Sequence, residues 1–405
     1  MRVPKLRFKE FEGDWETHPV GSVCDFIVPA RNKPKDFDGS IPWITIPDIE
    51  QNQRVYTSKS GLNITKDEAL RTGSKIVPIN AVIISCVGDL GLVAISGKEM
   101  VLNQQLHAFI PKKKIFYQFL VYELTNKKEF MEKVATKTSV LYMNKENCNS
   151  IPVCYPSIPE QTKIANFLTT IDDYINQLTR KHALLTQYKK AAMQQIFSQQ
   201  LRFKDENGEA FADWEETKLG EITSKIGSGS TPRGGQEVYQ KHGVLFIRSQ
   251  NVNDGKLLLN DIVYISEKIN NQMQGSVVEP NDILLNITGA SIGRSCVVPS
   301  DFKVGNVNQH VCIIRLTKNH NPVFIHTFLS SDDGQKKIFS HQVGSGREGL
   351  NFQAIRSFKF YAPSFPEQIK IANFLTQLDQ QLDQLQQQID KVKQYKQGLL
   401  QQMFV

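Results

Sequence analysis

The sequence predicts an α+β protein with two globular domains separated by two long antiparallel coiled-coil helices, arranged as a pseudo-twofold internal repeat. Two observations lead to this prediction. Two segments of similar sequence recur along the chain and carry a helical pattern of apolar residues. The longer segments outside them contain short apolar runs that are typical of strands.

The repeat is clearest where PEQTKIANFLTTID begins at Pro159 and PEQIKIANFLTQLD begins at Pro366, an offset of 207 residues. Upstream, the motif LRFK recurs at Leu6 and Leu201. Each half therefore holds a divergent block followed by a similar block of about 40 residues. These boundaries predict four segments: a first domain (1–158), a central helix (159–199), a second domain (200–365) and a C-terminal helix (366–405).

Both similar blocks show apolar residues at alternating steps of three and four, the 3.5-residue period of a coiled-coil seam. The seam positions are Ile164, Leu168, Ile171, Ile175, Leu178, His182, Leu185, Lys189, Ala192 and Ile196, and Ile371, Leu375, Leu378, Leu382, Leu385, Ile389, Val392, Lys396, Leu399 and Met403. The spacing from Ser157 to Glu160, and from Ser364 to Glu367, predicts capping boxes at the helix starts. Because a one-sided seam needs a partner, we expect an antiparallel helix pair about 60 Å long. We expect the polar seam residues His182 and Lys189 to set the register or to lie at the wet edge.

The divergent blocks predict α+β domains. Strand-sized apolar runs occupy residues 41–49, 81–88, 92–96 and 106–111, and in the same order 243–249, 282–289, 295–299 and 310–316. Residues 117–134 and 323–341 are the predicted helices.

Charge and composition limit the class of protein. The 405 residues carry a formal charge of +7, which permits a polyanionic partner without requiring one. No apolar run approaches a membrane span, and the N-terminal MRVPKLRFKE has no signal-like apolar stretch, so we expect a cytoplasmic protein without a membrane segment. The six cysteines form no CxxC motif, so we expect buried thiols rather than a zinc site or a redox pair.

Catalytic motifs are absent from the sequence. It has no P-loop, no GxGxxG before a helix, no [DN]PPY, no GxSxG and no HExxH. The carboxylates of Asp48 and Glu50 are only a weak sign of a nuclease. The sequence therefore favours a binding or scaffold protein without a cofactor of its own.

Arginine, asparagine, glutamine and threonine cluster with glycine in the expected loops of both divergent blocks, and such side chains can pair with DNA base edges. The candidate DNA-binding residues of the first block are Arg31, Lys33, Lys35, Thr45, Gln104 and Gln105. Those of the second block are Thr231, Arg233, Arg248, Gln250, Asn251, Arg294, Gln309, His310 and Arg347. Among them, Lys35 and Arg347 look more like phosphate contacts.

At this point the chain resembles the specificity (S) subunit of a type I restriction–modification system. The resemblance rests on the two PEQxKIANFL helix starts, on GSTPRGG and YQKHGVLFIRSQNV (229–252), and on VGSGREGLNFQAIRSFKFYAPSFPEQ (343–368). It covers essentially the whole chain. The first block departs from the pattern at 134–161, where the Gly-Ser-Gly turn is missing.

The resemblance implies that each divergent block is a target recognition domain for one half of a bipartite, asymmetric double-stranded DNA target. It implies that the helices set the spacing and dock two modification subunits, which use S-adenosylmethionine to methylate adenine N6. Two restriction subunits would add ATP- and Mg-dependent translocation and cleavage. The chain itself would have no active site and no metal.

Two alternatives remain open from the residues alone. The chain could be a coiled-coil scaffold that binds protein and not DNA, in which case its basic charge is incidental. It could also be an unrecognised nuclease or methyltransferase, against which the missing motifs speak.

Overall fold

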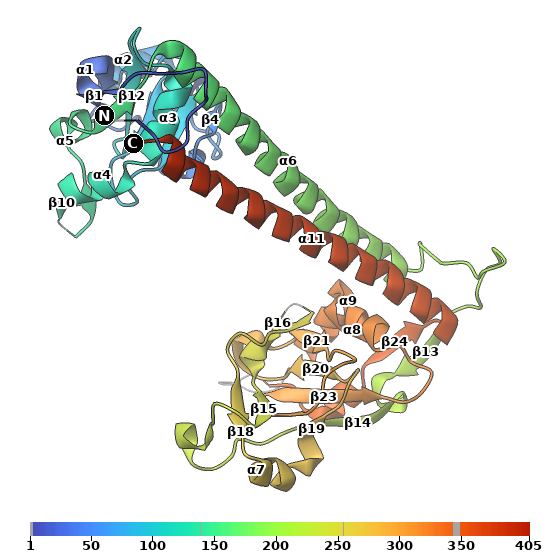
Figure 1. Ribbon diagram of the computed structural model, residues 1–405. Coiled ribbons are helices and arrows are strands. Elements are labelled where there is room, and N and C mark those ends of the chain that lie inside the picture. The colour runs from blue at the N-terminus through green and yellow to red at the C-terminus, as the bar shows by residue number, and fades with distance from the viewer. Residues whose placement is uncertain (1–2, 138, 254, 343–348) are drawn as a thin grey trace. The chain divides into compact units, whose positions relative to one another are not determined.

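The computed structural model describes residues 3–137, 139–253, 255–342 and 349–405 (Figure 1). The chain divides into two compact units. Unit 1 consists of Met1–Thr179 and Gln387–Val405, and unit 2 consists of Arg180–Gln386. Each unit combines strands with short helices and with parts of two long helices, as the α+β prediction requires.

The main sheet of unit 1 has five strands in the order β2-β9-β6-β7-β4, antiparallel except for the β4–β7 pair. A second sheet has the order β5-β3-β8, and β1 pairs with β12 and β10 with β11. The strands are β1 (Glu16–Pro19), β2 (Cys24–Ile27), β3 (Ile41–Ile44), β4 (Arg54–Val55), β5 (Asn63–Ile64), β6 (Val82–Ser85), β7 (Val93–Ser96), β8 (Val101–Leu102), β9 (Leu106–Pro111), β10 (Thr136–Lys137), β11 (Leu141–Tyr142) and β12 (Pro152–Tyr155).

The helices of unit 1 cover this sheet and supply much of its core. They are α1 (Val20–Val23), η1 (Ile46–Asp48), α2 (Lys66–Thr72), α3 (Tyr117–Thr125), α4 (Lys128–Val134) and α5 (Lys145–Asn149). The predicted helix 117–134 is therefore two helices, which break after Thr125.

Unit 2 has two four-stranded sheets, with the orders β14-β23-β20-β21 and β18-β15-β22-β19. In addition, β13 pairs with β24 and β16 with β17. The strands are β13 (Glu215–Lys218), β14 (Thr223–Ser228), β15 (Val244–Ile247), β16 (Val252–Asn253), β17 (Lys256–Leu257), β18 (Val263–Ile265), β19 (Val277–Val278), β20 (Ile283–Asn286), β21 (Ser295–Val297), β22 (Gly305–Val307), β23 (Val311–Leu316) and β24 (Lys359–Ala362).

The helices of unit 2 repeat the pattern of unit 1. They are η2 (Leu219–Glu221), η3 (Gly235–Val238), η4 (Ser249–Asn251), α7 (Glu267–Gln272), η5 (Gln274–Ser276), η6 (Gly289–Ser291), α8 (Pro322–Ser330), α9 (Asp332–Ser340) and α10 (Phe352–Arg356). The predicted helix 323–341 breaks at Ser331, whose extended backbone (φ −70°, ψ 162°) ends α8. The Ser331 hydroxyl then accepts a hydrogen bond from Gly334 N and caps α9.

The two long helices are α6 (Ile158–Phe197) and α11 (Phe365–Met403). Their bounds lie close to those predicted from the repeat, and every predicted seam residue is buried or partly buried, which confirms the 3.5-residue pattern. In unit 1 the two helices pair antiparallel, with Lys396 bound to Asp172. In unit 2 they also pair antiparallel, with the predicted register residue Lys189 bound to Asp379. The two ion pairs are related by the 207-residue offset.

The glutamates near the helix starts form ion pairs that the capping-box prediction did not anticipate. The Glu160 carboxylate accepts hydrogen bonds of 2.8 Å from Nε and Nη2 of Arg7. Glu367 accepts equivalent bonds of 2.8 and 3.0 Å from Arg202. Because both glutamates are fully buried, these arginines neutralise charges that water does not reach. The repeated LRFK motif is therefore the partner of the repeated helix start.

The last turns of both long helices enter domain cores. In unit 1, Phe404 stacks on Phe119 with ring centroids 5.3 Å apart. In unit 2, Phe197 packs against Phe324 at 5.7 Å. The backbone N–H of Leu6 also bonds the carbonyl of Gln402, so both ends of the chain lie in unit 1 (Figure 1).

Candidate functional site

An asparagine-anchored loop occupies the same place in both units. The side chain of Asn103 accepts a hydrogen bond from Gln105 N (3.1 Å), and that of Asn308 accepts one from His310 N (3.0 Å). This local turn lifts Gln104 and Gln309 onto the surface, where both are exposed. The candidate residues Gln104 and Gln105 in unit 1, and Gln309 and His310 in unit 2, therefore lie on equivalent loops.

The same loops are fixed to the ends of equivalent strands. Asn103 N bonds the carbonyl of Ile44 at 2.9 Å, and Asn308 N bonds the carbonyl of Ile247 at 3.1 Å. The next residues are Thr45 in unit 1 and Arg248 in unit 2, both candidates from the sequence. Each loop therefore lies beside the residue that follows β3 or β15.

In unit 2 a further loop joins this group. The Thr231 hydroxyl hydrogen-bonds Gln309 Oε1, and Gln309 Nε2 lies 3.1 Å from His310 Nε2. Gly229 N bonds the carbonyl of Asn308, and a Cβ at Gly229 would lie 1.7 Å from a backbone oxygen. Glycine is required for this close approach. Arg233 is exposed two residues beyond Thr231.

Arg248 and Gln250 meet at one carboxylate. Arg248 Nη2 lies 3.4 Å from Asp261 Oδ1, and Gln250 Nε2 hydrogen-bonds Asp261 Oδ2. The Asp261 side chain is 73% exposed, so water weakens its interactions with Arg248 and Gln250. Both donors can therefore exchange Asp261 for another acceptor.

Asn251 has a different position from its neighbours. Its side chain is buried, its Oδ1 accepts from Arg248 N (3.0 Å), and its Nδ2 donates to the carbonyls of Leu258 and Asp261. All of its hydrogen bonds shape the loop, so we place Asn251 outside the candidate surface. Asp48 holds the equivalent position in unit 1, where its Oδ2 accepts hydrogen bonds of 2.7 Å from N and Oγ1 of Thr45.

Arg294 borders an open cavity of ≈ 360 Å³ that Ser249, Thr288 and His310 also line. Thr288 and His310 share a hydrogen bond. Sequence reasoning missed Ser249, Thr288 and Asp261. The recurrence of NAVIISCVG as NDILLNITG points to the loop that carries Thr288, whereas no repeated pattern marks Asp261. Arg347 lies outside the described residues.

In unit 1 the candidates come from three loops, two of which are in direct contact. Gln104 Nε2 donates to the carbonyl of Ala30 (3.0 Å), next to the exposed Arg31. The Lys33 ammonium lies 5.6 Å from the ring centre of Trp43 in β3. These contacts bring Arg31, Lys33, Thr45, Gln104 and Gln105 to one region.

Lys35 lies on a loop that is fixed by a buried acid. Its backbone N bonds Glu68 Oε1 at 2.7 Å, while its side chain is exposed. The Arg71 guanidinium, followed by the Lys35 amide, lowers the pKa of Glu68 to about 2. Glu68 is therefore ionised at neutral pH and holds this loop in place.

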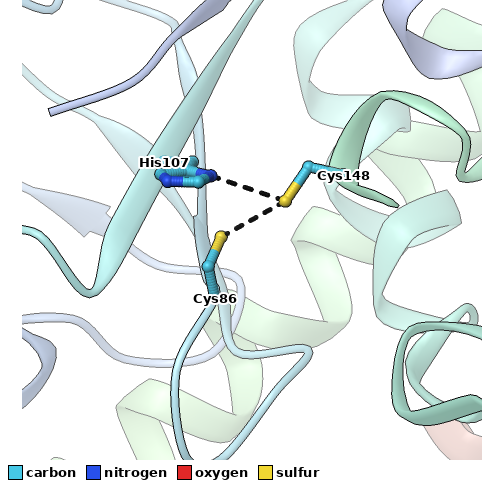
Figure 2. A group of neighbouring side chains, drawn as sticks. All are labelled: Cys86, His107 and Cys148. Atoms are coloured by element: carbon cyan, nitrogen blue, oxygen red, sulfur yellow. Dashed lines mark hydrogen bonds between the residues drawn. The ribbon is translucent and has the colours of Figure 1, made fainter. Parts of the chain in front are cut away.

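The sequence predicted buried thiols and no zinc site, but a cluster of possible metal ligands lies in unit 1. Figure 2 shows Cys86, His107 and Cys148 side by side, and all three are buried. Within the described residues this is the one group of three or more such side chains close enough to hold one ion. The six cysteines are free and buried, as expected from the sequence.

None of the helices in the described ranges has the length and apolar composition needed to cross a membrane.

Comparison with known proteins identifies the family. A family model described as the type I restriction modification DNA specificity domain matches residues 12–186 and 212–394. The chain therefore belongs to this family, as a type I restriction–modification specificity subunit that carries two copies of the domain.

Individual relatives agree with this assignment. The type I restriction enzyme MjaVIII specificity subunit of Methanocaldococcus jannaschii is 23% identical over 417 residues, covering 97% of this chain and 94% of the relative. The MjaIX specificity subunit of the same organism is 23% identical over 329 residues, covering 78% and 76%. The crystal structure of a type I restriction-modification S subunit from M. genitalium matches with a TM-score of 0.62 at 16% identity, covering 100% and 99%. This match supports the predicted fold.

Proposed function

We propose that each unit reads one half of a bipartite, asymmetric double-stranded DNA target. The observation that carries this proposal is that an equivalent loop group recurs in both units with different side chains. Gln104 and Gln105 in unit 1 correspond to Gln309 and His310 in unit 2, and Thr45 corresponds to Arg248. Amide and guanidinium groups can distinguish base edges in the major groove, so different side chains on one frame would read different sequences.

We assign the exposed cations near these loops to the DNA backbone. Lys35 and Arg31 in unit 1, and Arg233 and Arg294 in unit 2, are exposed and long enough to contact phosphates without fixed geometry. Arg347 stays a proposed phosphate contact. Binding through such cations would weaken steeply with salt. Arg248 and Gln250 would exchange Asp261 for a base, since this carboxylate competes for the same donors.

The two long helices, in this proposal, set the distance between the half-sites and dock two modification subunits. Exposed side chains with large apolar surfaces lie along both helices and offer contact area for such subunits. Tyr174, Leu184, Tyr188 and Tyr395 are 42%, 55%, 53% and 57% exposed. The chain would not catalyse a reaction. The modification subunits would bring S-adenosylmethionine, and two restriction subunits would bring ATP and Mg²⁺.

The test is long-read mapping of N6-methyladenine in DNA from cells that co-express the chain with its modification subunits. We expect a split motif that depends on the chain. Arg248→Ala and Gln309→Ala should each weaken discrimination between bases at one half-site, by roughly 5- to 150-fold per lost base contact. The other half-site should be unchanged.

The control for these variants is Lys318→Ala, which removes an exposed cation beyond the opposite end of β23. It should leave both half-sites intact. If the assembled complex methylates no split motif, the protein-scaffold alternative replaces this proposal. If Arg248→Ala alters both half-sites, the assignment of one reader to each unit is wrong.

The spacing role has its own test. Thr179 and Gln386 are equivalent under the repeat, and duplicating one heptad after each would keep both seams in register. The helix pair would lengthen by about 10 Å. We expect the unread gap to grow by up to about three base pairs with both half-sites unchanged. An unchanged gap would show that the helices do not act as the spacer.

A further inference from the structure

Three side chains of unit 1 converge although they are far apart in the sequence. Cys86 follows β6, His107 lies in β9 and Cys148 lies in α5. Cys148 Sγ is 3.6 Å from Cys86 Sγ and 3.4 Å from His107 Nδ1 (Figure 2). The three ligand atoms lie within 4.8 Å of one another. The exposed fractions of the residues are 0%, 3% and 0%, so the group is sealed from solvent.

These distances match the edges of a tetrahedral metal site. Zinc lies about 2.3 Å from a thiolate and about 2.1 Å from an imidazole nitrogen, which places two thiolates about 3.8 Å apart and a thiolate about 3.6 Å from the nitrogen. The observed separations of 3.6 and 3.4 Å are close to both values. Two of the three donor pairs therefore already have the spacing of ligands to one ion, and Cys86 Sγ and His107 lie within 4.8 Å of each other.

The chemistry of the thiols also suits a cation. Soft thiolate ligands favour zinc, and a divalent cation would displace the protons of both thiols. Two thiolates with a neutral imidazole would then make the buried site electrically neutral.

Unit 2 shows that the fold does not require these groups. Cys86 N bonds the carbonyl of Gln105 (2.8 Å), as Ile287 N bonds that of His310 (3.0 Å), so Cys86 and Ile287 are equivalent.

The other two positions also have counterparts in unit 2. Strand pairing makes Cys312 the counterpart of His107, and the matching helix caps at Asn144 and Asn351 make Ile355 the counterpart of Cys148. Ile287, Cys312 and Ile355 all belong to a buried apolar core. In unit 2, members of an apolar core therefore fill these three positions. Packing alone does not explain why unit 1 has three side chains that can bind a metal there.

We propose that unit 1 binds one Zn²⁺ ion through Cys86 Sγ, His107 Nδ1 and Cys148 Sγ. The ion would join β6, β9 and α5 directly behind the loop that carries Gln104 and Gln105, since Cys86 is bonded to that loop. Three protein ligands leave one position of a tetrahedral ion for a buried water molecule. The site does not depend on the proposed DNA reading.

The test is the metal content of the full chain after expression with added zinc, purification under reducing conditions and dialysis. Elemental mass spectrometry should find one zinc per chain. Loading with Co²⁺ should give a thiolate-to-metal charge-transfer band, which reports the sulfur ligands directly.

The decisive variant is Cys86→Ala with Cys148→Ala, which removes both thiol ligands and adds no volume to the buried core. It should keep native circular dichroism and bind zinc at least about 100-fold more weakly. The matched control Cys296→Ala removes a buried cysteine of unit 2 and should retain the metal. Zinc-free wild-type chain with reduced thiols, a Cys86–Cys148 disulfide in the fresh protein, or equal zinc in the double variant would each overturn the proposal.

Discussion

Equivalent ion pairs join the long helices in unit 1 and unit 2, but their surroundings differ. In unit 1 the side chains of Lys396 and Asp172 are 12% and 11% exposed, and Tyr122 donates a further hydrogen bond of 2.8 Å to Asp172. In unit 2 the side chains of Lys189 and Asp379 are 25% and 50% exposed. The repeat therefore preserves the partners of an interaction, whereas the packing around them decides its contribution to stability.

The largest expected loss of stability concerns the buried glutamates. Arg7→Ala would remove both Arg7 hydrogen bonds from Glu160 and destabilise unit 1 by about 3 kcal/mol. Arg202→Ala should cost unit 2 about 2 kcal/mol, because Trp214 Nε1 still donates to Glu367 at 3.2 Å. Hydrogen exchange read by mass spectrometry separates the two units.

Lys9→Ala serves as the control, since Lys9 is exposed, and its effect should stay within about 0.5 kcal/mol. Equal losses for the two arginine variants would show that the Trp214 hydrogen bond contributes nothing.

The helix-pair lysines should have smaller effects on stability. Lys396→Ala should destabilise unit 1 by about 2 kcal/mol, since it leaves Asp172 buried and also removes a cation 5.3 Å from the ring of Tyr122. Lys189→Ala should cost less than about 1 kcal/mol, because Asp379 regains water. Double-mutant cycles with Asp172→Asn and Asp379→Asn measure each coupling. Identical couplings would contradict the role of burial.

The smallest expected difference depends on pH. Burial, with a contribution from Lys189, lowers the pKa of His326 in unit 2 to about 4, whereas Val121 holds the equivalent position in unit 1. Between pH 6.5 and 4 the unfolded chain binds the proton more readily than the folded one, so stability falls as pH falls. We expect His326→Val to remove between about 1 and 2 kcal/mol of this pH dependence, since the ring is only partly buried. Calorimetric unfolding of the wild type and of His326→Val at decreasing pH measures this difference. If lower pH shifts both unfolding curves equally, the assignment is wrong.

Local patterns predicted much of this architecture. The seam residues of both helices lie where the 3.5-residue period places them, and most apolar runs became strands such as β6 and β20. The helix breaks at Thr125 and Ser331 escaped prediction because the apolar pattern runs across them.

Side-chain partners were harder to predict, because they depend on contacts between distant segments. The sequence predicts Asn251 as a surface amide. In the structure its side chain is buried and donates hydrogen bonds to the carbonyls of Leu258 and Asp261. The Cys86, His107 and Cys148 cluster joins three separate elements, so no spacing rule for metal ligands could find it. The repeat remains the best signal, because it identifies the loops that hold Gln104 and Gln309.

The packing of Met403 and Phe404 into the core of unit 1 bears on the order of events during synthesis. Unit 2 is formed by the continuous stretch Arg180–Gln386, so all of its native contacts become available while translation proceeds. Unit 1 lacks part of its hydrophobic interior until residues 387–405 emerge from the ribosome. The domain that is translated first therefore completes its folding last, and its nascent form exposes the aromatic surface around Trp15 and Phe119 to chaperones throughout that interval.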